Sequence, residues 1–230
     1  MFSKILLIGE RKKEVNNNKI LRVMIIVFGN QKGGCGKTTN CAQFANYLSE
    51  LGKEVLVLDL DFQRSLMDRR EEDIKTYDNE PKYEIMEAKI SDVAKVIRDF
   101  KNVDNGNLII DLPGRIDNDA LGVILNAADI IVCPFRYDKF TMDSTGFFIQ
   151  IIQYLKVKAK VFFLPNNIRS SVRYETKEQI ISILEKIGVV TKEIPQSVLM
   201  ERANTLLITG ECMNLVKGAY DCIIEQGGIK

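Results

Sequence analysis

The chain has 230 residues, of which 46% are hydrophobic, and its formal net charge is +1. This length and apolar content suit one sizeable core, so we expect a single domain at the long end of the usual range. The near-neutral charge excludes a global basic field for nucleic acid, and the absence of histidine excludes histidine-based catalysis and metal binding. The five cysteines are scattered without a C-x-x-C pair, which is typical of a reducing cytosol.

The N-terminal region predicts no secretion signal and no membrane anchor. The apolar run over residues 5–8 is too short for either, and residues 10–19 are charged and rich in asparagine. We therefore expect residues 1–21 to be a flexible tail or a non-native extension and residues 22–230 to form one domain. Met24, at the head of the first apolar run, is a candidate native start.

An apolar run over residues 23–28 is followed by a glycine-rich loop and then by helical periodicity over residues 39–51. Strand, glycine loop and helix are the context that a phosphate-binding loop needs, because the loop amides and the helix N-terminus both favour an anion. Lys37 would reach the β- and γ-phosphates, and the Thr38 hydroxyl would bind Mg²⁺. The predicted nucleotide-binding residues are Gly33, Gly34, Cys35, Gly36, Lys37, Thr38 and Thr39.

The loop departs from the common G-x-x-x-x-G-K-[ST] pattern, which needs glycine where this chain has Gln31. It resembles the deviant Walker A ATPases typified by ParA and MinD, whose hallmark is K-G-G-x-G-K-T. Lys32 matches the signature lysine of that family and Lys37 the loop lysine. The resemblance implies a homodimer that forms with ATP, in which Lys32 reaches the nucleotide of the other subunit. A second ammonium there would neutralise charge that ATP presents in full and ADP does not.

The second predicted strand, over residues 54–59, ends in two acidic residues, Asp59 and Asp61. ParA-like proteins carry a similar D-x-D-P-Q, and the resemblance implies that Asp61 positions the attacking water. We expect Asp59 to order the Mg²⁺ shell through water, with two solvated turn aspartates as the alternative. Phe62 stands in place of the family's proline, and residues 68–89 are charged and irregular and predict no defined element.

The next predicted strand, over residues 107–112, follows a helix predicted over residues 91–100 with Ser91 as its cap. Its apolar run over residues 108–110 ends in Asp111, the pattern of a Walker B carboxylate that holds Mg²⁺ through water. The following pair, Pro113 and Gly114, resembles the switch region of the family, which implies that a Gly114 amide senses the γ-phosphate.

Two more strands are predicted over residues 130–135 and 161–164, with helices over 142–155 and 176–187. Alternation of strands and helices throughout predicts an α/β fold, a doubly wound, mostly parallel sheet with helices on both faces, as in P-loop NTPases. Asn166 follows the last of these strands. The resemblance implies that Asn166 contacts adenine, although Asn167 could take that part and an ordinary turn is an equal alternative.

The subgroup is inferred from what the chain lacks. It has no cluster-binding cysteine after Asp111, no C-x-x-C and no terminal tyrosine cluster, and residues 219–226 are acidic where MinD has a basic membrane-binding helix. The remaining resemblance is to short ParA-type partition ATPases. It implies ATP and Mg²⁺ as cofactors, non-specific DNA and a ParB-like or small centromere-binding protein as partners, no membrane, and a bacterial cytoplasmic, nucleoid-associated location.

The predicted DNA-contacting residues are basic positions in the last third of the chain, with an ordinary solvated face as the alternative. They are Lys156, Lys158, Lys160, Arg169, Arg173, Lys177 and Arg202. Other functions stay open: transfer of a conjugative or mobile element, MinD-like positioning, an adaptor that scarcely hydrolyses ATP, and a metabolic P-loop ligase.

Overall fold

The computed structural model describes residues 23–61, 64–103, 105–114 and 118–230. Its strands are β1 (Val23–Phe28), β2 (Val55–Asp59), β3 (Glu84–Glu87), β4 (Gly106–Asp111), β5 (Ile130–Phe135), β6 (Lys160–Ile168), β7 (Val189–Val190) and β8 (Ile194–Pro195). The sheet order is β3-β2-β4-β1-β5-β6-β7, with β8 paired to the end of β6, and each of these described pairs is parallel. The predicted tail, residues 1–21, lies outside the described residues.

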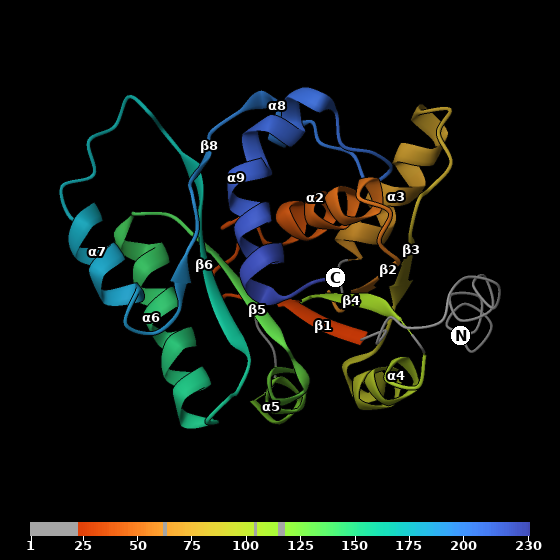
Figure 1. The fold of residues 1–230 in the computed structure, drawn as a ribbon, viewed down its shortest axis with the longest axis horizontal. Helices are drawn as coiled ribbons and strands as arrows, with labels where there is room; N and C mark the ends of the chain where they lie inside the picture. The colour runs from red at the N-terminus through yellow and green to blue at the C-terminus, as the bar shows by residue number, and fades with distance from the viewer. Residues whose placement is uncertain (1–22, 62–63, 104, 115–117) are drawn as a thin grey trace.

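Helices cover both faces of this sheet (Figure 1). One face carries α2 (Lys37–Glu50), α3 (Ser65–Thr76), α8 (Val198–Glu201) and α9 (Gly210–Gly227). The other carries the short 3₁₀ helix η1 (Ile90–Asp92), α4 (Val93–Phe100), α5 (Asn118–Ala127), α6 (Lys139–Tyr154) and α7 (Lys177–Leu184). The predicted doubly wound, parallel α/β fold is confirmed.

The central strand β1 contributes apolar side chains to the cores on both faces of the sheet. Ile25 and Val27 pack with the helices of one face, whereas Ile26 and Phe28 pack with those of the other. Strands that are covered on both faces read as continuous apolar runs, because alternate side chains point to opposite sides. The position of β1 between β4 and β5 brings the loop after Phe28 to the middle of the sheet's carboxyl edge.

Three predictions of local structure were wrong. Residues 68–89 hold most of α3 and all of β3 where no element was predicted. Ser91 does not cap α4, because its hydroxyl donates to the Asp92 side chain, 3.4 Å away. β6 continues to Ile168, because its pairing with β8 extends it beyond the predicted end at residue 164.

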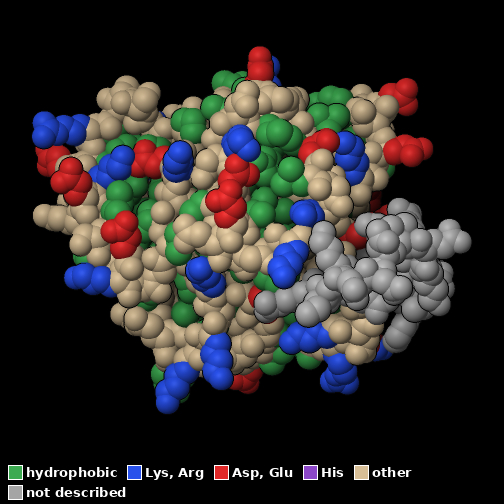
Figure 2. Space-filling model, viewed as in Figure 1, with side chains coloured by type: hydrophobic (Ala, Val, Ile, Leu, Met, Phe, Trp, Pro, Cys, Tyr) green, Lys and Arg blue, Asp and Glu red, His purple; other side chains and the backbone are tan. Residues whose placement is uncertain are grey.

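No helix in the part of the chain that the structure describes is both long enough and apolar enough to cross a bilayer. The apolar face of α9 is buried: Val216, Tyr220 and Ile223 pack in the core that α9 shares with α2. Figure 2 shows both acidic and basic side chains on the side of the molecule that is in view. This mixed distribution agrees with the net charge of +1.

Candidate functional site

The glycine-rich loop joins the end of β1 to the start of α2. Gly34 and Gly36 adopt left-handed backbone angles, with φ of 73° and 95°. A Cβ on Gly36 would lie 2.1 Å from the Asn166 amide nitrogen, so a side chain is excluded there by space as well as by φ. The sequence needs glycine at this position because the loop turns sharply against β6.

The two loop lysines occupy different environments. Lys37 is only 7% exposed, and its ammonium donates a hydrogen bond of 2.9 Å to the Lys32 carbonyl inside the loop. The Lys32 side chain is exposed on the outer side, where its ammonium lies 5.9 Å from the centre of the Phe140 ring. The Lys37 ammonium therefore lies inside the loop, whereas the Lys32 ammonium lies on the outer surface.

Asp111, the last residue of β4, has the features of a metal-binding carboxylate. Burial raises its pKa to about 7, and a hydrogen bond from the Thr38 side chain opposes that rise. Its Oδ1 atom is buried and has no hydrogen-bond partner among the described residues. A buried carboxylate oxygen with no donor suits a cation, so Asp111 and the adjacent Thr38 hydroxyl fit Mg²⁺.

Asp59 shapes the loop that carries Asp61. Its Oδ1 accepts the Asp61 amide at 3.0 Å, and its Oδ2 accepts the first amides of α3, from Leu66 at 3.1 Å and Met67 at 3.3 Å. Burial raises the pKa of Asp59, and these three donors oppose the rise. The carboxylate caps α3, a role the sequence did not predict, and its part in the Mg²⁺ shell stays a prediction. Phe62, in the family's proline position, lies outside the described residues.

The predicted switch residues lie against the glycine loop. Pro113 is buried, and a Cβ on Gly114 would lie 3.8 Å from the Gly33 amide nitrogen. Gly114 follows β4 by three residues, so the chain that leaves the Asp111 carboxylate passes directly beside the loop. The sensing role of Gly114 stays a prediction.

Asn166 lies within β6 and not beyond its end as predicted. Its amide donates 3.0 Å to the Cys35 carbonyl, so it holds the glycine loop in place. A pocket opens beside it, lined by Gly34, Gly36, Thr39, Asn166, Asn167, Pro195, Ser197, Met200 and Glu201. Both asparagines line this pocket, and contact with adenine by either one stays a prediction.

The sequence profile described as "CobQ/CobB/MinD/ParA nucleotide binding domain" matches residues 26–206. The chain belongs to this family. Over 42 residues it is 55% identical to the chromosome-partitioning ATPase Soj of Thermus thermophilus, a match that spans 18% of this chain and only 17% of Soj.

Two solved structures share the fold of this ParA/MinD-type chain. A plasmid partition protein of Borrelia burgdorferi bound to AMPPNP is 16% identical with a TM-score of 0.72, over 89% of this chain and 99% of that one. The ATP complex of a Cyanothece McdA variant is 15% identical with a TM-score of 0.72, over 91% of this chain and 98% of that one. The likeness to these structures concerns the fold.

The structure of this ParA/MinD-type domain also reveals residues that sequence reasoning missed. Arg136, directly after β5, donates a hydrogen bond from its guanidinium to the Gly34 carbonyl. Asn30, at the start of the loop, donates to the Pro134 carbonyl at 2.9 Å and to the Thr145 hydroxyl at 3.0 Å. These contacts fix the loop to β5 and α6, which lie more than a hundred residues away in the sequence. No local sequence pattern predicts them.

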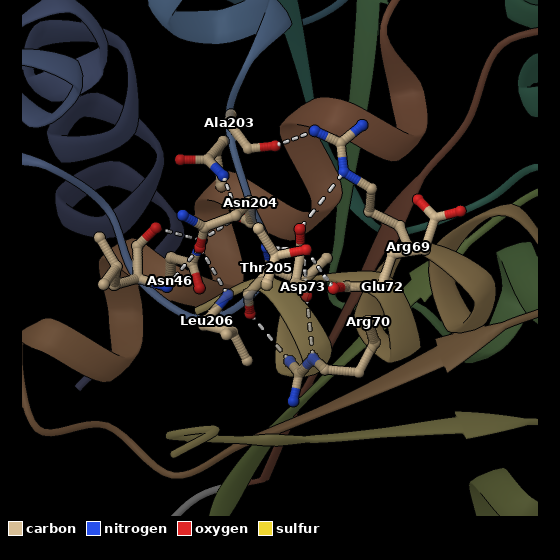
Figure 3. Close-up of polar contacts among 12 residues, drawn as sticks. Asn46, Arg69, Arg70, Glu72, Asp73, Ala203, Asn204, Thr205 and Leu206 are labelled. Atoms are coloured by element: carbon tan, nitrogen blue, oxygen red, sulfur yellow. Dashed lines mark hydrogen bonds and ion pairs between the residues drawn. The ribbon is translucent and has the colours of Figure 1, made fainter. Parts of the chain in front are cut away.

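A buried polar network holds the chain just beyond α8, whose residues Met200 and Glu201 line the pocket (Figure 3). From α3, Arg70 donates to the Thr205 hydroxyl at 3.0 Å and its carbonyl at 2.9 Å, and Asp73 accepts the Thr205 amide at 2.7 Å. From α2, Asn46 donates 2.9 Å to the Asn204 carbonyl. The network ties α2 and α3 to Asn204 and Thr205, shortly after α8.

The predicted DNA-contacting residues do not form one patch. Lys156 and Lys158 precede β6, whereas Arg169 and Arg173 follow it, and nine strand residues span roughly 30 Å. Arg202 is exposed after α8, and because β8 runs parallel to β6 it shares the carboxyl edge with the second pair. Lys160 donates to the Gln226 carbonyl at 2.8 Å, and Lys177 pairs with Glu193 at 2.6 Å.

Proposed function

We propose that this chain is an ATP-dependent, dimerising switch ATPase of the ParA type that acts in plasmid or chromosome partition. ATP binding pairs two copies across their nucleotides, and the paired form binds DNA without sequence specificity. A ParB-like or small centromere-binding protein then stimulates slow hydrolysis, which separates the copies and releases the DNA. This cycle belongs to a bacterial cytoplasm, with the ATP-bound form on the nucleoid.

The observation that carries this proposal is the unlike placement of the two loop lysines. Lys37 is buried inside the loop, where a phosphate can replace the Lys32 carbonyl as its partner. Lys32 points outward beside Phe140, which is 73% exposed. An exposed cation and an exposed aromatic ring next to a nucleotide loop form a surface that a second copy can cover.

Other residues have further roles in this proposal. Lys37, the loop amides and the N-terminus of α2 hold the phosphates, and Asp61 positions the attacking water. Thr38 and Asp111 hold Mg²⁺, which supplies positive charge to the phosphate oxygens when it is bound. The described residues contain no group of three or more acidic or cysteine side chains that could cage a metal. Oxygen atoms of the nucleotide would then complete the coordination of Mg²⁺ beside Thr38 and Asp111.

The test compares Lys32→Ala with Lys101→Ala, a matched removal of an exposed lysine just beyond α4. We expect Lys32→Ala to bind a fluorescent, non-hydrolysable ATP analogue within about threefold of wild type, because the Lys32 side chain points away from the interior of its own loop. Light scattering with the same analogue and Mg²⁺ should show a monomer for Lys32→Ala and a dimer for wild type and Lys101→Ala. A dimer of unchanged stability in Lys32→Ala contradicts the proposal.

The DNA step rests on Arg169, Arg173 and Arg202, which share the carboxyl edge of the sheet. The partition names of Soj and of the Borrelia protein support the partition role as a whole. Each phosphate neutralised should add about 0.9 to the slope of log affinity against log salt. If ATP-dependent retention on DNA shows no such salt dependence, these arginines do not contact the DNA phosphates.

A further inference from the structure

Arg136 is the charged residue nearest the glycine loop that the proposed function leaves without a role. It directly follows β5, and its guanidinium donates to the Gly34 carbonyl. Its Nε atom is buried and has no hydrogen-bond partner among the described residues. The side chain therefore reaches the loop with one donor engaged and a second donor unsatisfied.

An unpaired, buried donor on a charged group is costly, and native proteins keep few of them. The carboxylate of Asp138, two residues along the chain, does not accept from this donor. Asp138 is engaged at the start of α6, where its side chain accepts the Thr141 amide at 2.9 Å and the Thr141 hydroxyl at 2.8 Å. Among the described residues, this donor of Arg136 therefore has no acceptor.

The position of Arg136 along the loop indicates which acceptor a ligand would supply. In a phosphate-binding loop the helix N-terminus holds the inner phosphates, and the loop lysine reaches outward to the β- and γ-phosphates. Arg136 contacts Gly34, three residues before Lys37, and Gly114 approaches the adjoining Gly33. This part of the loop surrounds the outer end of a triphosphate.

We infer that Arg136 is a third cation of the nucleotide site and that its guanidinium donates to the terminal phosphate of ATP. The inference rests on the proposed function, because it assigns a further contact to the same substrate. The guanidinium carries several donors in a fixed plane, so it can hold the Gly34 carbonyl and a phosphate oxygen at the same time. Arg136 therefore favours ATP over ADP from within its own subunit.

The test measures the affinities of Arg136→Ala for a fluorescent, non-hydrolysable ATP analogue and for the matching ADP analogue, both with Mg²⁺. We expect ATP-analogue affinity to fall by about tenfold to a hundredfold, the effect of one hydrogen bond to a charged group, and ADP affinity to change by less than about threefold. Arg98→Ala, an exposed arginine on α4, is the matched control and should change neither affinity.

Two results overturn the inference: an unchanged affinity for the ATP analogue, or an equal loss for both nucleotides, which would mean that Arg136 only shapes the loop. Arg136→Gln keeps a planar polar group without the charge, and it gives the same comparison if the alanine variant does not fold. A wild-type chain that binds neither nucleotide overturns the proposed function as well. A wild-type chain that binds ATP, with variants that keep its preference over ADP, overturns the role of Arg136 alone.

Discussion

At the scale of single residues, Gly36 is the position where the loop tolerates least change. Its φ of 95° and the 2.1 Å approach of Asn166 both penalise a side chain. Gly33, three residues earlier, offers a matched comparison, because a Cβ there would have no neighbour within 4 Å. The two glycines differ in environment although they stand in the same short motif.

We expect Gly36→Ala to lower the free energy of unfolding by roughly 2–4 kcal/mol, from the left-handed backbone and the displaced Asn166 amide. Gly33→Ala should change it by less than about 0.5 kcal/mol. Urea unfolding without nucleotide measures both variants. An equal loss in the free energy of unfolding for both variants would show that the close approach of β6 does not exclude a side chain at position 36.

The buried Asp111 carboxyl predicts a pH dependence of stability. Its pKa is raised by burial from 3.8 to about 7, so the folded state keeps the proton longer than the unfolded state. Below the unfolded pKa, ionisation of this carboxyl does not change the free energy of unfolding. As the pH rises between the two pKa values, ionisation lowers the free energy of unfolding progressively. Above both values the loss stays constant.

Replacing Asp111 with asparagine removes this penalty. Without nucleotide and Mg²⁺, we expect the stabilising effect of Asp111→Asn to be larger at about pH 8 than at about pH 5, by roughly 2 kcal/mol. Asp143→Asn, at an exposed position on α6, is the control and should show no such difference. An effect of Asp111→Asn that is the same at both pH values contradicts the burial of a titrating carboxyl.

The residues of the site were predictable where a local motif carries them. The glycine run marks the loop, and an apolar strand that ends in aspartate marks Asp111, because strand periodicity and positive φ are local properties of the sequence. Arg136 could not be found in this way. Its contact with Gly34 spans 102 residues and depends on β5 lying next to β1.

At the scale of elements, α3 shows why a helix can escape prediction. Its buried residues are Leu66, Arg70 and Asp73, so its inward face carries charge in place of an apolar stripe. The helix is held by hydrogen bonds that form only in the folded chain, to Thr205 and to the Tyr83 carbonyl. Periodicity identifies helices that pack through apolar contacts, and α3 packs through polar ones.

We expect Asp73→Ala to destabilise the protein by roughly 2–3 kcal/mol, because the buried Thr205 amide loses its acceptor. Asp68→Ala removes an exposed carboxylate from the same helix, 3.7 Å from Arg64, and should cost less than about 1 kcal/mol. Thermal unfolding at a pH near neutrality compares the two variants. A loss in Asp73→Ala no larger than that in Asp68→Ala would mean that the network does not anchor α3.

At the scale of the whole molecule, the order of the strands explains why the site forms where it does. The chain places β1 at the centre of the sheet, so the ends of β2, β4, β5 and β6 all lie near the loop. They bring Asp59, Asp111, Arg136 and Asn166 to one edge, as expected of ligand sites in doubly wound sheets. Strand and helix alternation predicts this architecture, whereas the late strands β7 and β8 depend on pairing with β6 that the sequence does not reveal.

The proposed switch requires that this edge pair with the same edge of a second copy only when ATP is present. The most direct measurement is the light-scattering mass of the purified chain with Mg²⁺ and a non-hydrolysable ATP analogue, compared with Mg²⁺ and ADP. We predict that the mass doubles with the ATP analogue and stays that of a monomer with ADP. A mass that is the same with both nucleotides would contradict the account.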